Sequence, residues 1–120
     1  MRIFAVPTRQ ITVHASHGVV MDFLPRMART DGIRVNIARI EAGGTIGEHR
    51  APVRQIFAIV DGRGEVAAGG GSRRQIEAGQ AAVWEPGEMH QSWATVDMLV
   101  AIVETQGEIE LGEQFVEIHD

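Results

Sequence analysis

The sequence predicts an all-β domain in which short strands form a barrel or a two-sheet sandwich. Short β-branched or apolar segments recur along the chain, roughly 8–12 residues apart, and turn-forming residues separate them. Glycine is abundant, with 14 of the 120 residues, as expected where many tight turns join strands. The expected strands cover residues 11–13, 34–41, 56–60, 81–84, 98–104 and 115–118. The expected turns lie at residues 31–32, 43–44, 61–62, 69–71, 78–79 and 86–87.

The apolar runs indicate strands that are covered on both faces. Residues 56–60 (IFAIV) and 98–103 (MLVAIV) are continuously apolar, whereas a strand with one face in water alternates apolar and polar residues. One face would line the barrel, and the other would pack on a second sheet or on another subunit, which favours a homodimer. Helical patterns are scarce. Residues 21–29 could make one or two helical turns, which Pro25 interrupts.

Length and composition bound the class of protein. With 120 residues, no linker and no repeat, residues 1–120 are expected to form one domain, with residues 1–33 as an N-terminal segment packed on the barrel. The net charge is −5 and no basic patch stands out, so nucleic-acid binding is not expected. The absence of cysteine excludes disulfides and thiolate ligands. No run approaches the ~20 apolar residues of a membrane span, and the N-terminus has no signal-peptide pattern, so a soluble, cytoplasmic protein is predicted.

Two segments share a regular spacing of glycine and histidine. Residues 43–62 read GGTIGEHRAPVRQIFAIVDG, and residues 79–94 read GQAAVWEPGEMHQSWA. The first resembles the cupin motif glycine, five residues, His-x-His, three or four residues, glutamate, six residues, glycine. The second resembles the cupin motif glycine, five residues, Pro-x-Gly, two residues, histidine, three residues, asparagine. His49 and His90 stand at histidine positions of these motifs.

The resemblance implies a fold, a site and a partner. The fold is the cupin double-stranded β-helix, a jelly-roll-like barrel with residues 43–94 as its motif core, and cupins of this size commonly pair as homodimers. Cupins that bind a divalent metal usually do so through three histidines and one glutamate. Here Ala51 replaces the second histidine and Gln55 replaces the glutamate, and a neutral amide is a weak ligand for a transition metal.

The site expected from this comparison contains His49, Gln55 and His90. These three residues and water could hold zinc, iron, nickel or manganese with reduced affinity. A metal-free pocket in which the histidines bond to a ligand or to each other is an equal alternative. On one strand, His49 and Gln55 would share a face, because side chains alternate, and Phe57 would continue that face as an apolar wall. A tight turn at residues 86–87 would then bring His90 in from an opposing strand.

Other residues near the motifs are weaker candidates. Glu88 could be an acid or base near the pocket mouth, or an exposed turn carboxylate. Trp84 and Trp93 could stack on a flat ligand at the entrance, or pack in the core. His14 and His17 could fold over the mouth and supply a missing ligand, although surface positions are the simpler interpretation.

Three functions are compatible with these residues, and the fold does not choose among them. The first is a metal-assisted oxygenase, isomerase or cyclase that acts on a small organic molecule. The second is a small-molecule binding or sensor module without metal or catalysis. The third is a metal-free sugar epimerase of the cupin kind, which the lack of tyrosine and of an evident acid partner disfavours.

Overall fold

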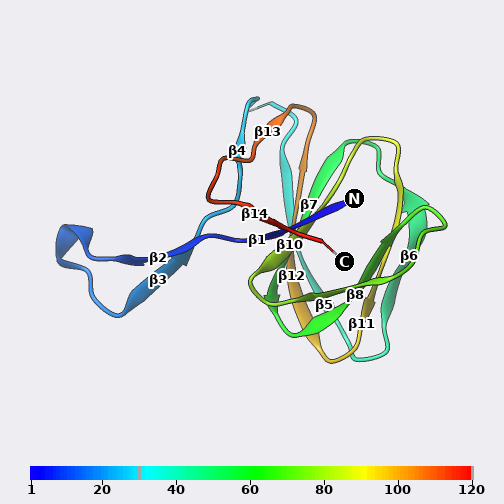
Figure 1. Cartoon of the computed structure of the whole chain (residues 1–120), viewed down its shortest axis with the longest axis horizontal. Helices are drawn as coiled ribbons and strands as arrows, with labels where there is room; N and C mark the ends of the chain where they lie inside the picture. The colour runs from blue at the N-terminus through cyan, green and yellow to red at the C-terminus, as the bar shows by residue number, and fades with distance from the viewer. Residues whose placement is uncertain (30, 120) are drawn as a thin grey trace.

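The computed structural model describes residues 1–29 and 31–119, which form a barrel of two antiparallel sheets and a hairpin that extends from it (Figure 1). The larger sheet has six strands in the order β14 (Val116–Ile118), β1 (Arg2–Ala5), β10 (Gln80–Trp84), β7 (Arg54–Asp61), β12 (Met98–Thr105) and β5 (Arg34–Ile40). The smaller sheet has four strands in the order β6 (Thr45–Arg50), β11 (Met89–Ala94), β8 (Arg63–Ala68) and β9 (Arg74–Glu77). The expected all-β barrel is confirmed.

Two strand pairs lie outside these sheets. The pair β13 (Ile109–Glu110) and β4 (Arg26–Met27) lies beside the six-stranded sheet, and β2 (Thr8–Ile11) pairs with β3 (Val19–Asp22) in the extended hairpin. A single 3-10 turn, η1 (Val13–Ala15), forms the hairpin tip. Across the described residues, no helix has the length and apolar character needed to traverse a bilayer.

The continuous apolar runs are covered on both faces, as expected. On β7, Phe57 and Ile59 face the barrel interior, whereas Ile56 and Ala58 face outward. The interior cluster draws on both sheets. The outer face of the six-stranded sheet is covered in part by this chain's own segments around β4 and β13, through partly buried side chains of Leu24, Met27, Ile109 and Leu111 and the buried Phe115.

The helix expected at residues 21–29 is wrong. This segment contains the end of β3, then Pro25, then β4. Proline lacks the N–H group that a helix interior needs, and the extended backbone lets Leu24 and Met27 pack on the sheet.

The N-terminal segment, residues 1–33 of the expected domain, is divided between two places in the described chain. Strand β1 is an inner strand of the large sheet, and the β2–β3 hairpin points away from the barrel.

The segment of residues 43–62, which resembles the first cupin motif, does not form one continuous strand between His49 and Gln55. We expected His49, Ala51 and Gln55 on one strand, but β6 ends at Arg50 and β7 begins at Arg54. Pro52 lies in the intervening bend, where its ring and missing N–H end the strand pairing. His49 and Gln55 therefore belong to different sheets and face each other across the interior.

Gly64 allows two strands of the smaller sheet to approach each other closely. A Cβ atom at Gly64 of β8 would lie 2.0 Å from the carbonyl oxygen of Trp93 on β11, a separation that no pair of such atoms tolerates. The absence of a side chain thus permits the close approach of these two strands.

Candidate functional site

The histidine pair sits on neighbouring strands of the four-stranded sheet. His49 of β6 and His90 of β11 are direct register partners, so both side chains point to the same face. Their ring centroids lie 4.1 Å apart with an edge-to-face angle of 62°. His49 is exposed at the rim, whereas His90 is buried, with 4% of its surface accessible. The pair therefore joins the interior to the solvent.

The turn before β11 has a defined geometry. The N–H of Glu88 donates to the carbonyl of Glu85 over 3.1 Å, and Gly87 has a φ of +88°. Proline at the second position and glycine in the left-handed region at the third are typical of a type II turn. This turn ends one residue before β11 and sets the position at which His90 enters the barrel.

A cavity of about 160 Å³ lies between the two sheets and contains most of the expected site. His49, Gln55, Phe57, Trp84 and His90 all line it. Gln55 comes from β7 with 7% of its surface exposed. Larger concavities exist on the surface, but the histidine pair does not line any of the three that exceed 400 Å³.

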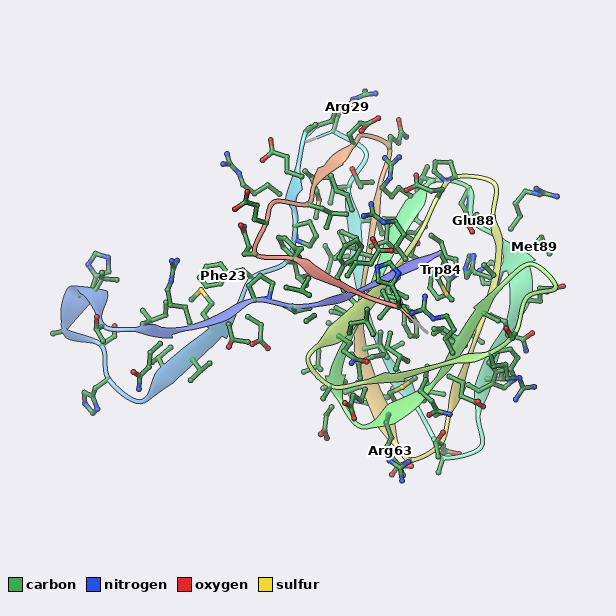
Figure 2. The ribbon with its side chains drawn as sticks, viewed as in Figure 1. Phe23, Arg29, Arg63, Trp84, Glu88 and Met89 are labelled. Carbon is green, nitrogen blue, oxygen red and sulfur yellow. The ribbon has the colours of Figure 1, made fainter. Side chains whose placement is uncertain are left out.

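Trp84 forms the floor of this cavity. It is fully buried on β10, and its indole N–H donates to the carbonyl of Ala67 over 3.3 Å. Its ring meets Phe57 edge-to-face at 5.5 Å and lies at a 32° tilt, 4.8 Å from the ring of His90. Figure 2 shows Trp84 within the barrel. Aromatic contacts of this kind restrict the orientation of the imidazole.

Trp93 lies outside the cavity. Residues of β11 alternate, so His90 and Ser92 face inward and Trp93 faces outward. The guanidinium of Arg73 stacks on the Trp93 ring at 3.8 Å. Of the two tryptophans considered for ligand contact, Trp84 is the one that lines this cavity.

Glu88 is engaged elsewhere. One carboxylate oxygen accepts a hydrogen bond from the amino group of Met1 over 2.8 Å, and the other accepts from the N–H of Glu85 over 2.7 Å. Partial burial raises the pKa of Glu88, but these two bonds outweigh that effect and hold the pKa below its ordinary value. Glu88 lies on the turn before β11 and does not line the cavity (Figure 2). An ionised carboxylate with two donors is poorly suited to donate or accept a proton.

The electrostatics of the site favour the neutral form of His90. Burial lowers the pKa of His90, and the charge of His49 lowers it further. The backbone of Glu88 and the carboxylates of Glu104 and Glu88 offset part of this shift. The buried Nδ1 of His90 has no hydrogen-bond partner within the described part of the chain. In His49, Nδ1 lies 2.7 Å from the carbonyl oxygen of Gly47, which can only accept, so Nδ1 is the donor in this hydrogen bond.

Three polar residues of the cavity were not among those predicted from the sequence. Asn36 on β5, Ser92 on β11 and Glu104 on β12 complete its wall. Glu104 is the cross-strand register partner of Gln55, so a carboxylate lies beside the position at which Gln55 replaces one. The only available signal was the presence of polar residues at inward positions of otherwise apolar strands. Without the strand pairing, that signal does not connect Glu104 with Gln55.

The donor set can be compared with the metal that the resemblance implies. Neutral imidazole suits zinc, copper, iron and nickel, so His49 and His90 are suitable donors as a pair. Nevertheless, residues 1–29 and 31–119 contain no group of three or more histidine, aspartate or glutamate side chains placed to hold one ion. Ala51, at the position of the second histidine, is fully buried in the core. The residues as placed therefore do not fit a metal held by a complete protein ligand set.

Comparison with known proteins identifies the family of this barrel. A family model described as the cupin domain matches residues 36–105, more than half of the chain. No curated protein sequence matches. A cupin-like protein from Thermotoga maritima superposes with a TM-score of 0.59 at 23% identity, over 71% of each chain. KdgF from Halomonas superposes with a TM-score of 0.59 at 26% identity, over 66% of this chain and 73% of that one. The DMSP lyase DddQ from Ruegeria pomeroyi has a TM-score of 0.58 at 19% identity, over 69% of this chain and 42% of its own.

Proposed function

The chain belongs to the cupin superfamily, and we propose that its interior cavity binds a compact, polar organic molecule that contacts His90, Gln55 and Glu104. One observation carries this proposal. The buried Nδ1 of His90, which lines the cavity, has no hydrogen-bond partner among the residues described, and the polar side chains of Asn36, Gln55, Ser92 and Glu104 line the same space. Buried polar groups in folded proteins are nearly always bonded, so Nδ1 of His90 needs a partner from outside the described chain, such as a ligand or water.

The cavity restricts the size and character of the ligand. A volume of about 160 Å³ corresponds to roughly five water molecules in the liquid, which is room for a small metabolite and too little for a long chain. Phe57, Trp84 and Ile102 provide the apolar part of the lining, and a few polar side chains provide the rest. This division between an apolar body and a few polar groups is typical of small-molecule sites.

The same residues could catalyse proton transfer. His90 is neutral near pH 7 because its pKa is lowered, so it can accept a proton from a bound molecule. Glu104, which lies in the same wall, is the carboxylate best placed to accept a hydrogen bond from a ligand hydroxyl or amine. An isomerisation that moves one proton would use these two groups without a further protein residue.

A metal-assisted enzyme is the second candidate. The observation that favours it is the register pairing of His49 and His90, whose ring centroids lie 4.1 Å apart, with Nδ1 and not Nε2 of His49 bonded to the carbonyl of Gly47. His49 and His90 would hold a zinc, iron, nickel or manganese ion, and Gln55 or water would complete the coordination shell. The ion would supply Lewis acidity for an oxygenase, isomerase or cyclase reaction. The incomplete set of charged donors places this candidate second.

One pair of measurements separates the candidates. Small hydroxy acids, amides and diols are screened against the chelator-treated protein by ligand-observed NMR, with Gln55→Leu and His90→Leu as test variants. Trp93→Leu, on the outward face, is the control. Binding that both test variants abolish and the control retains supports the metal-free pocket. Binding that survives both test variants would refute it.

Elemental analysis of untagged protein addresses the metal. Less than one tenth of an equivalent, unchanged in His49→Ala, is expected if the pocket is metal-free. Near one equivalent that is lost in His49→Ala would instead establish the second candidate.

A further inference from the structure

We propose that a groove along β9 is a second binding site, which takes a small molecule with at least two anionic groups, carboxylate or phosphate. The inference is independent of what the interior cavity binds. The groove has a volume of about 430 Å³ and follows β9, the edge strand of the smaller sheet, with the end of β14 also in its lining. No described residue lines both the groove and the interior cavity, so the two sites can be tested separately.

The lining of the groove is basic, although the chain as a whole is acidic. Arg63, Arg73, Arg74 and His119 line it, and among the described residues Glu77 is the one carboxylate that does so. The chain carries a net charge of −5, so this gathering of cationic side chains is local. A small anion is repelled by the net charge of the protein and attracted to the groove, which favours binding at this place over others.

The charge of the groove acts on a neighbouring carboxylate. Glu117 accepts two hydrogen bonds from Arg2, over 2.8 Å and 3.1 Å. These bonds are the main reason that the pKa of Glu117 lies below its ordinary value, and the charges of His119 and Arg74 lower it further. Arg74 is held against β14 by a hydrogen bond to the carbonyl of Ile118 over 2.5 Å. It therefore contributes its charge to the groove from a fixed position.

Arg73 is oriented for anion binding by its contact with a tryptophan. Its guanidinium stacks on the ring of Trp93 at 3.8 Å. Stacking occupies a flat face of the guanidinium and leaves its N–H groups pointing outward in the plane. One of these groups lies 3.5 Å from a carboxylate oxygen of Glu65, which is long for a hydrogen bond, and the Arg73 side chain is 53% exposed. A planar guanidinium held in this way can bind a carboxylate or phosphate through two parallel hydrogen bonds.

Arg63 places a second cationic group at a distance along the groove. It is exposed at the start of β8, where Glu77 of β9 is its register partner. Figure 2 shows Arg63 at the lower end of the barrel. Arg74 pairs with Val66, three positions further along β8, which corresponds to roughly 10 Å of strand. Basic positions separated in this way fit a ligand with more than one anionic group better than they fit a single small anion.

A titration with defined anions at constant ionic strength tests the site. Citrate and pyrophosphate are the probes, acetate is the single-charge control, and NMR follows the two indole N–H signals. Citrate or pyrophosphate should move the Trp93 signal, through Arg73, and leave the buried Trp84 signal in place. It should bind at least about tenfold more tightly than acetate, because the second contact of a linked pair is intramolecular. The tighter of the two probes identifies carboxylate or phosphate as the preferred group.

Variants of the lining locate the bound anion. Arg63→Gln and Arg73→Gln should each weaken binding of the tighter probe about fivefold, because each removes a charge and its donors. Glu77→Gln should strengthen binding, because it removes the carboxylate that repels the anion. Arg34→Gln is the matched control, since Arg34 is exposed on β5 at the opposite edge of the large sheet from β14, and it should leave binding unchanged.

Several results would overturn the proposal. One is the lack of any shift of the Trp93 signal with millimolar citrate and pyrophosphate, and another is equal binding of acetate. Affinity that survives Arg63→Gln unchanged, or that Arg34→Gln lowers to the same extent, would show that the contact is a general effect of charge. Movement of the Trp84 signal in place of the Trp93 signal would put the anion in the interior cavity and not in the groove.

Discussion

Replacement of Gln55 by leucine should make the ligand-free protein more stable while it removes ligand binding. Gln55 as a whole residue is 7% exposed, and no hydrogen bond of its amide to the described chain is found, so the amide reaches the space of the cavity without being fully enclosed. A buried polar group without a partner costs about 1–3 kcal/mol. Because the cavity can admit water to one side of the amide, the lower end of that range applies, about 1 kcal/mol. Leucine has a similar volume and removes this cost.

The measurement is urea unfolding of chelator-treated protein, with the midpoint and slope fitted separately. A gain of about 1 kcal/mol corresponds to a rise of roughly 3–6 °C in the melting temperature for a domain of this size. Gln91→Leu is the matched control. Gln91 lies on β11 and donates to the hydroxyl of Thr45 over 3.1 Å, so the same chemical change removes a made bond and should lower stability by about 0.5–1 kcal/mol.

The test compares the change in unfolding free energy caused by Gln55→Leu with that caused by Gln91→Leu, and the two changes are expected to have opposite signs. If Gln55→Leu destabilises the protein as much as Gln91→Leu does, then the Gln55 amide is hydrogen-bonded in the ligand-free protein. That result would contradict the proposal that the amide binds a ligand in the cavity. Stability gained at the expense of binding is the usual signature of a functional site.

Three further predictions concern the wall of the barrel. The lowered pKa of His90, caused first by burial and then by the charge of His49, means that the unfolded chain binds a proton at a higher pH than the folded one. The unfolding free energy of metal-free protein should therefore fall as the pH drops from 6.5 toward the folded pKa, and an unchanged slope in His90→Gln would contradict this assignment. Gly64→Ala should lower stability by at least ~2 kcal/mol in urea unfolding, because its Cβ would meet the carbonyl oxygen of Trp93 at 2.0 Å, and an unaltered midpoint would refute the close contact. Trp93→Phe should shift the fluorescence maximum to shorter wavelength, since the remaining Trp84 is fully buried, and a shift to longer wavelength would reverse the placement of the two rings.

Much of the fold could be predicted because its signals are local. The apolar run at residues 56–60 lies on β7, and the turn at residues 86–87 precedes β11, because strand composition and turn chemistry act over a few neighbouring residues. The helix expected at residues 21–29 fails for a local and a non-local reason, because Pro25 interrupts it and Leu24 and Met27 pack on the sheet in an extended backbone.

The site was predicted less completely. His49, Gln55 and His90 do line one cavity, but the expected reason, one strand for the first two, was wrong because the strand breaks at Pro52. The outward direction of Trp93 depends on where β11 begins, since a shift by one residue reverses every side chain of a strand. That boundary is set by the turn and by pairing with two neighbouring strands.

By itself, the sequence determined the all-β class, the cupin resemblance and the two histidines of the pocket, because these depend on residue type and spacing along the chain. Only the tertiary structure decided that Glu104 stands beside Gln55, that Asn36 borders the same cavity, and that residues 8–22 leave the barrel as an arm. The physical reason is that strand pairing joins distant segments, such as those of Gln55 and Glu104, through backbone hydrogen bonds that every residue except proline can make. The side-chain pattern of a strand therefore indicates which of its residues face the interior. The pairing of the strands determines which of those residues are neighbours.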